Sequence, residues 1–334
     1  MPSDAHPAAD IVSPYPDIRA EQTRWISERR PARNNVDARM PYAALSEVER
    51  AQDGEVMPTA TLFLTNRECP FRCLMCDLWS NTLTHSVALG DIPAQIDYGL
   101  AQLPVSRQIK LYNSGSFFDT RAIPSEDYPA IVARLHNFER VIVESHPAFI
   151  NEYCFSFRTL LNESASGRLE VAMGLETSNP AVLERLNKGI TLGTFRHAAQ
   201  QLRDHGVGLR VFILVKPPFQ DEHEALEWAK RSLDFAFDCG ATVACLIPTR
   251  EGNGALESLE QAGQWSPPHL ATLEAVAAYG VRLQRGRVFS DLWDLERFST
   301  CTLCFSARHE RLHQMNLSQK VLPEAVCSLC GEGR

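Results

Sequence analysis

Apolar and polar residues form two alternating kinds of block along the chain. Short apolar runs, typical of buried strands, cover residues 59–65, 108–112, 140–144, 169–173, 208–215 and 242–247. The longer segments that follow space their apolar residues as helices do, over 94–103, 128–137, 154–162, 180–187, 194–205, 222–238 and 268–279. This alternation predicts an α/β protein of six βα units, with a parallel sheet and right-handed crossovers.

Six units are fewer than the eight of a closed (β/α)8 barrel. We therefore expect a partial (β/α)6 TIM-like barrel over residues 56–280, with ligands at the mouth where the strands end. Residues 1–16 are rich in Ala, Pro and Asp and predict a disordered tail, and residues 17–55 predict an N-terminal helical extension. Residues 281–334 predict a C-terminal module that opens with an edge strand over 281–289.

Composition and charge narrow the class of protein. The chain has 334 residues, ten cysteines and a net charge of −8. It contains neither the ~18-residue apolar run of a membrane span nor the apolar core of a signal peptide, which predicts a cytoplasmic protein. Cysteines in the cytoplasm favour metal sites over disulfides. The acidic balance predicts no general attraction to nucleic acid, although the arginines between 19 and 39 form either a solvated helix face or a phosphate-contacting patch.

Three cysteines follow the first predicted strand within eight residues. Cys69, Cys73 and Cys76 have the spacing C-x3-C-x2-C. Each thiolate could bind one iron of a [4Fe–4S] cubane, and three ligands would leave the fourth iron open to a substrate. The alternatives are a zinc site with a distant fourth ligand and three unrelated core cysteines. Zinc rarely uses two gaps this short without a nearby fourth ligand.

Four more cysteines form two C-x2-C pairs near the C-terminus. Cys301 and Cys304 are separated from Cys327 and Cys330 by 22 residues. Two pairs of this kind can supply the four thiolates of a zinc-ribbon-like site. An auxiliary iron–sulfur cluster and the absence of any metal are the alternatives.

The C-x3-C-x2-C loop resembles the cluster loop of the radical S-adenosylmethionine (SAM) superfamily. The resemblance implies a [4Fe–4S] cluster on Cys69, Cys73 and Cys76, SAM at the open iron, and reductive cleavage of SAM to a 5′-deoxyadenosyl radical. It also implies an electron donor of the flavodoxin or ferredoxin type. The residue before the third cysteine is usually aromatic in that superfamily and stacks on the SAM adenine. Here it is Met75, which can still pack on a purine face.

The ends of later strands supply candidate SAM-binding residues. Residues Asn113, Ser114, Gly115 and Ser116 resemble, by position, the Gly-rich motif that binds the SAM amino group. An ordinary turn is the alternative. The segment Gly174–Ser178 resembles the G-x-E segment of the branch with the Elongator catalytic subunit and the methylthiotransferases, which makes Glu176 a candidate SAM contact rather than a structural acid.

Two further strand ends carry charged or titratable side chains. Glu144 and His146 end the third strand, but a lone Glu or His is weak evidence for substrate binding. Lys216 ends the fifth strand and could meet an anionic substrate or the SAM carboxylate, or could extend along the barrel rim into water. No catalytic residue is identified from the sequence.

Several segments together resemble the archaeosine-forming radical SAM lyase family over about residues 55 to 330. They are Leu186–Gly189, Lys216–Phe219, Trp265–Pro268 and the four-cysteine tail. The resemblance implies C–N bond cleavage on a lysine-modified 7-deazaguanine in tRNA. One alternative is a radical SAM enzyme that acts on a small molecule or peptide and carries an auxiliary cluster. Another is a non-catalytic zinc protein that binds RNA.

Overall fold

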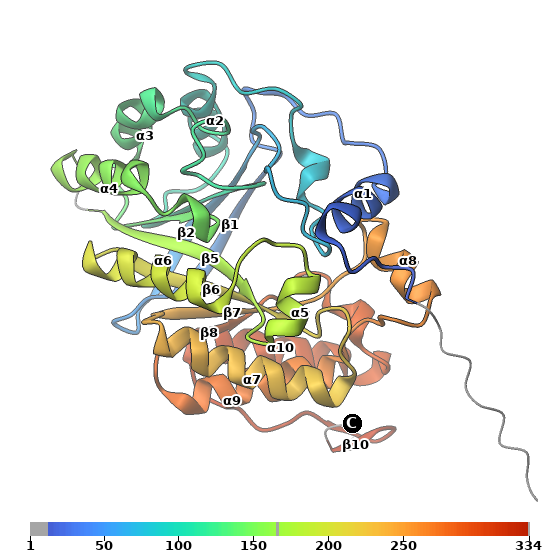
Figure 1. Cartoon of the computed structure of the whole chain (residues 1–334). Coiled ribbons are helices and arrows are strands. Elements are labelled where there is room, and N and C mark those ends of the chain that lie inside the picture. Colours follow the sequence, from blue (N-terminus) through green and yellow to red (C-terminus); the bar gives the residue numbers. More distant parts are fainter. Residues whose placement is uncertain (1–12, 165–166, 333–334) are drawn as a thin grey trace, which may run out of the picture.

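The computed structural model describes residues 13–164 and 167–332 and forms one curved sheet with helices on its outer face (Figure 1). The strands stand in the sheet in chain order, from β1 to β8. Strands β2 to β8 are parallel, and β1 runs antiparallel to β2. Their bounds are β1 Ala43–Arg50, β2 Val56–Leu64, β3 Gln108–Asn113, β4 Arg140–Glu144, β5 Arg168–Glu176, β6 Gly208–Val215, β7 Val243–Pro248 and β8 Arg287–Ser290. The predicted fold class, a partial TIM-like barrel, is confirmed.

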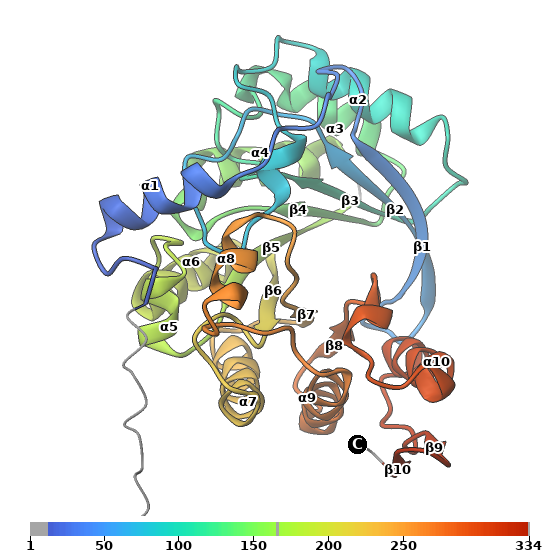
Figure 2. The same ribbon diagram turned by 90° about the vertical axis from the view of Figure 1, so that its right-hand side faces the viewer.

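The helices are α1 Arg19–Arg29, α2 Asp91–Leu100, α3 Tyr128–Leu135, α4 Glu152–Ser164, α5 Pro180–Arg185, α6 Leu192–Asp204, α7 Glu222–Asp238, α8 Ala255–Gln261, α9 Leu270–Leu283 and α10 Thr302–Ser318. Most of the helices connect successive parallel strands and pack on the convex side of the sheet, whereas α1 and α8 pack on each other and α10 follows the last strand of the sheet (Figure 2). A short hairpin, β9 Val326–Cys327 and β10 Gly331–Glu332, ends the described chain. Capping boxes at Thr191 and Asp221 fix the starts of α6 and α7.

Six of the strands and the helices between them match the sequence prediction, because parallel strands covered on both faces read as continuous apolar runs. Two strands do not. β8 is a seventh parallel strand of the main sheet, starting later than the predicted edge strand, because α9 continues to Leu283. The segment 17–55 is helical only at α1 and contributes β1 to the sheet, which corrects the expectation of a helical extension.

The strand β1 was missed because its inward-facing residues are charged. Glu49 is 5% exposed and pairs with Lys110 of β3 at 2.7 Å and with Arg210 of β6 at 2.5 Å. Arg210 also bonds Glu170 of β5 at 2.7 Å. The three partners of this network sit in the first half of their parallel strands, and Glu49 sits near the end of the antiparallel β1, so the paired charges fill the end of the barrel opposite the mouth. An apolar pattern cannot reveal such a strand.

Helix α10 closes the gap between the two edge strands (Figure 2). The side-chain amide of Asn316 bonds both backbone groups of Ser290, at 2.8 Å each, and that of Gln319 does the same for Val288, at 2.7 and 2.9 Å. On the other side, Arg50 of β1 donates to the carbonyl of Leu317 at 3.0 Å. The exposed edge of β8 is therefore hydrogen-bonded rather than open to another strand.

Residues 1–12 of the predicted tail lie outside the described part of the chain. Residues 13–16, which the prediction included in the tail, instead pack on the protein. Tyr15 is 2% exposed, lies edge-on to Trp25, and donates its hydroxyl to the carbonyl of Arg185 at 2.8 Å. Among the described residues, no helix is both long enough and apolar enough to cross a membrane.

Candidate active site and metal centre

The three-cysteine loop lies at the mouth of the half-barrel, directly after β2. Segments that follow other strands hold its backbone. Leu74 donates its N–H to the carbonyl of Leu186 at 2.9 Å, and Asn253 donates to the carbonyl of Leu74 at 2.7 Å. Asn187 donates to the carbonyl of Arg72 at 2.8 Å. The loops after β2, β5 and β7 thus meet at the cysteines.

The sulfurs of Cys69, Cys73 and Cys76 are not packed as the ligands of a single ion. Among residues 13–164 and 167–332, the groups whose ligand atoms all approach within 4.8 Å do not include them. A cubane is larger than one ion and holds its cysteines farther apart. Burial raises the pKa of Cys69 to about 11 and that of Cys73 and Cys76 to about 12. The thiols alone stay protonated near neutral pH, so a bound metal is what would hold them as thiolates.

The loop after β3 touches the first cysteine. Gly115 has φ +151, and a Cβ added there would lie 3.3 Å from the Cβ of Cys69. Ser114 donates its hydroxyl to the carbonyl of Leu78 at 2.8 Å, and Ser116 accepts from the N–H of His146 at 2.9 Å. Asn113 is 1% exposed, and neither its amide oxygen nor its amide nitrogen has a partner among the described residues. Orphaned buried amide groups of this kind fit a bound ligand.

A lysine pairs with one of two glutamates beside this loop. Lys188 binds Glu176 through Nζ and Oε1 at 2.7 Å. Burial, opposed by the charge of Lys188 and assisted by that of Glu176, raises the pKa of Glu144 to about 8. Burial lowers the pKa of Lys188, but the charge of Glu176 outweighs that effect and raises it. The mouth therefore holds one cation, one carboxylate paired with it, and one carboxyl group that is largely protonated near pH 7.

His146 is neutral and packs against the cluster loop. Its Nδ1 accepts from the N–H of Ala148 at 3.1 Å, so the proton lies on Nε2, 3.1 Å from the carbonyl of Lys188. Burial lowers the pKa of His146 to about 3, which keeps the ring neutral. The ring stacks on Phe71 of the cluster loop, with centroids 3.8 Å apart.

Lys216 and Met75 complete the predicted site residues. Lys216 is 5% exposed, pairs with Glu222 at 2.7 Å and donates to Ser266 at 2.9 Å, so its charge is already compensated. Met75 packs against two apolar clusters, one of which contains Trp265 and the other Leu214. Both Glu176 and Lys216 have positive φ, +66 and +57, a costly conformation for residues with a side chain.

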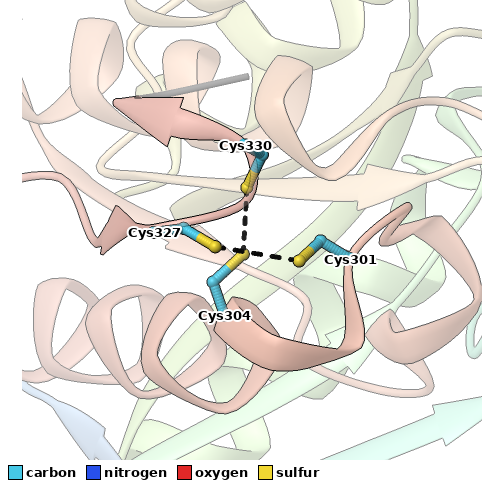
Figure 3. A group of neighbouring side chains, drawn as sticks. All are labelled: Cys301, Cys304, Cys327 and Cys330. Atoms are coloured by element: carbon cyan, nitrogen blue, oxygen red, sulfur yellow. Dashed lines mark hydrogen bonds between the residues drawn. The ribbon is translucent and has the colours of Figure 1, made fainter.

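The four C-terminal cysteines come together as the sequence predicts (Figure 3). Cys301 precedes α10, Cys304 lies in its first turn, and Cys327 and Cys330 lie in and after β9. The sulfurs of Cys301 and Cys327 are 3.8 Å apart, and those of Cys304 and Cys330 are 3.7 Å apart. Zn–S bonds of about 2.3 Å give a tetrahedron with edges of about 3.8 Å. The spacing of the sulfurs therefore fits a single tetrahedral ion.

Sequence reasoning missed the role of Lys188. The prediction of a helix over 180–187 made Lys188 and Gly189 the structural end of that helix, and the side chain instead turns back to Glu176. Gly174 could have indicated this, because a Cβ at Gly174 would lie 2.6 Å from Nζ of Lys188 and 2.2 Å from Oε1 of Glu176. The glycine of the G-x-E segment makes room for the ion pair.

Comparisons with known proteins place the chain among relatives. No family model matches it. It is 30% identical over 204 residues to the archaeosine synthase subunit beta of Methanosarcina acetivorans, across 59% of this chain and 58% of that protein. The archaeosine synthase subunit beta of Thermococcus kodakarensis is 28% identical, across 55% of this chain and 57% of that protein. Among solved structures, Elp3 of Methanocaldococcus infernus has a TM-score of 0.49 and 14% identity, across 68% of this chain and 59% of that one.

The match thus spans less than two thirds of the length of either archaeosine synthase subunit. Both of these relatives are named archaeosine synthase subunit beta, and the sequence motifs resemble the same archaeosine-forming family. The resemblance to the archaeosine-forming family that the sequence motifs indicated is confirmed by these two relatives.

Proposed function

We propose that this chain is a radical SAM enzyme whose [4Fe–4S] cluster is bound by Cys69, Cys73 and Cys76. The observation that carries the proposal is the three-cysteine loop at a barrel mouth, next to an unpartnered buried amide at Asn113 and the Glu176–Lys188 ion pair. When bound, the cluster and SAM would supply one-electron cleavage of SAM to methionine and a 5′-deoxyadenosyl radical.

The residues around the loop would bind and orient SAM. Its amino-acid part carries one ammonium and one carboxylate, and the mouth offers a carboxylate at Glu176, a carboxyl group at Glu144 that is largely protonated, and a cation at Lys188. Asn113 offers both a donor and an acceptor, and the loop through Ser114, Gly115 and Ser116 lets the backbone approach closely. Met75 would pack on the adenine. Lys216 is already paired with Glu222, so it would help to shape the site rather than offer SAM a free positive charge.

The proposed substrate is a modified tRNA base on which the enzyme acts as an archaeosine-synthase-like C–N lyase. The names of the two relatives support this class. The second candidate is a small molecule or peptide. In that case an auxiliary cluster would occupy the C-terminal cysteines, but their sulfur separations of 3.7 and 3.8 Å favour a single zinc ion with a structural role.

The test is release of 5′-deoxyadenosine by anaerobically reconstituted protein, given SAM and dithionite, with and without bulk tRNA that carries the lysine-modified base. We expect release that rises with tRNA, and about four irons and one zinc per chain. Release indifferent to tRNA, with about eight irons, would favour the second candidate. Release that persists in Cys76→Ala would refute the proposal.

A further inference from the structure

A basic hollow lies against the cluster loop, on a side that the proposed SAM residues do not reach. It has a volume of about 220 Å³. Cys69 lines it, together with Arg33, Arg67, Arg72 and Arg121. None of Asn113, Glu144, Glu176 and Lys188 is among the residues that line it. The hollow therefore reaches a proposed cluster ligand without passing through the mouth.

The arginines of the basic hollow carry more charge than the nearby acids compensate. A single carboxylate, that of Glu68, forms ion pairs with three arginines: Arg33, Arg72 at 3.1 Å and the adjacent Arg30 at 2.6 Å. Within the described ranges, Arg67 has no carboxylate within 4.0 Å, and its guanidinium bonds only the hydroxyl of Ser86, at 3.4 Å.

The outer arginine of the hollow is paired but reachable. Arg121 pairs with Asp119 at 3.2 Å, and its side chain is 56% exposed. With Glu68 shared by three guanidiniums, the surface is positive in a chain whose net charge is −8. A positive patch on an acidic protein attracts an acidic partner to that patch and orients it there.

We propose that the basic hollow is the docking surface for an acidic electron-carrier protein of the flavodoxin or ferredoxin class. The inference rests on the proposed function, which requires one electron for each SAM cleaved. One electron leaves the reduced carrier, which is oxidised by one electron, and passes to the cluster beside Cys69. That electron is consumed when the C5′–S bond of SAM breaks.

Position and charge favour a carrier over nucleic acid at this surface. Electron transfer needs a short path, and a carrier seated in the hollow would be next to a side chain that ligates the cluster. A tRNA base would have to reach the proposed SAM site at the mouth, and the residues of that site do not line the hollow. Complementary charge acts mainly on the association rate and weakens with salt.

The test measures binding directly. The reconstituted protein is titrated into a fluorescently labelled flavodoxin, and in parallel into a labelled ferredoxin, at low and high ionic strength. The variant is Arg67→Glu with Arg121→Glu. The matched control reverses two exposed arginines on α7 and α9, Arg231→Glu with Arg282→Glu. We expect salt-sensitive binding of a carrier to the wild type, a Kd raised by at least about tenfold in the variant, and little change in the control.

Activity then separates this inference from the proposed function. Release of 5′-deoxyadenosine driven by the carrier should fall in the variant, and release driven by dithionite should not. Absence of dithionite-driven release in the wild type would refute the proposed function and leave the binding result to decide the docking surface. Equal carrier affinity in variant and wild type, or no affinity in the wild type at low salt, would overturn the inference. Loss of tRNA binding alone would assign the hollow to phosphate.

Discussion

Substitution of Gly115 by alanine should displace the cluster loop without unfolding the protein. Gly115 has φ +151, which alanine adopts only with strain, and the added methyl would lie 3.3 Å from Cβ and 3.5 Å from Cα of Cys69. The strain is worth about 1–3 kcal/mol. The contact itself requires a shift of a few tenths of an ångström, and the atoms that must shift belong to a proposed cluster ligand.

A second glycine provides the control for backbone strain alone. Gly252 has φ +130, and a Cβ added there meets nothing within 4 Å. Gly252→Ala should therefore lose a similar 1–3 kcal/mol or so of unfolding free energy, because it carries the strain without the contact. Any difference between the two variants in metal loading then reports the displacement of Cys69.

The assay compares urea unfolding with iron content after anaerobic reconstitution. We expect both variants to shift the urea midpoint by similar amounts. Only Gly115→Ala should lose a large share of its cluster iron, while the zinc content of both stays near that of the wild type. Wild-type iron loading in Gly115→Ala would show that the loop after β3 does not set the position of Cys69, and the reasoning would fail.

Three further predictions test the charge network, the metal centre and the mouth. Arg210→Met should destabilise the fold by about 3–5 kcal/mol in urea unfolding, since two buried carboxylates lose their shared partner. The pKa values of Glu49 and Glu170 lie below their ordinary 4.5, so the unfolding free energy of the wild type should fall as pH drops below about 4.5. A flat pH profile there would contradict this. Cys330→Ser should abolish zinc binding by metal analysis while Tm of the barrel falls little, and a collapse of the whole fold would be the contrary result. Lys188→Met should weaken SAM binding by about tenfold or more in equilibrium dialysis with unchanged iron content, and unaltered affinity would remove it from the site.

The parts of this fold that could be predicted from the sequence are those whose signal is local. Six strands are continuous apolar runs, and both cysteine groups are defined by spacing. The strand β1 lacked such a signal, because Glu49 is favourable there only through cations on other strands, Lys110 and Arg210, of which Arg210 lies 161 residues later in the chain. Helix α10 was missed for a related reason. Its Arg308 and Arg311 are buried against Glu274 of α9, a partner that the residues between the two cysteine pairs do not reveal.

The candidate site shows the same division. Cysteine spacing predicts which residues face the mouth, but the electrostatic state of the mouth depends on segments that meet only in three dimensions. Glu144, Glu176 and Lys188 come from the ends of β4 and β5 and the turn after α5. The raised pKa of Glu144 follows from burial that no single segment of sequence records.

The contacts along helix α10 explain why a metal ion at the four cysteines should stabilise the C-terminal hairpin but not the barrel. At its C-terminal end, Asn316 and Gln319 bond the edge of β8 directly. In its middle, Arg308 holds Glu274 at 2.5 Å without any help from metal. Only Cys301 and Cys304 at its start would depend on a bound ion, and their partner cysteines lie in the last hairpin. Loss of zinc should therefore release the hairpin from α10, which limited proteolysis would detect, while the closure between β1 and β8 persists.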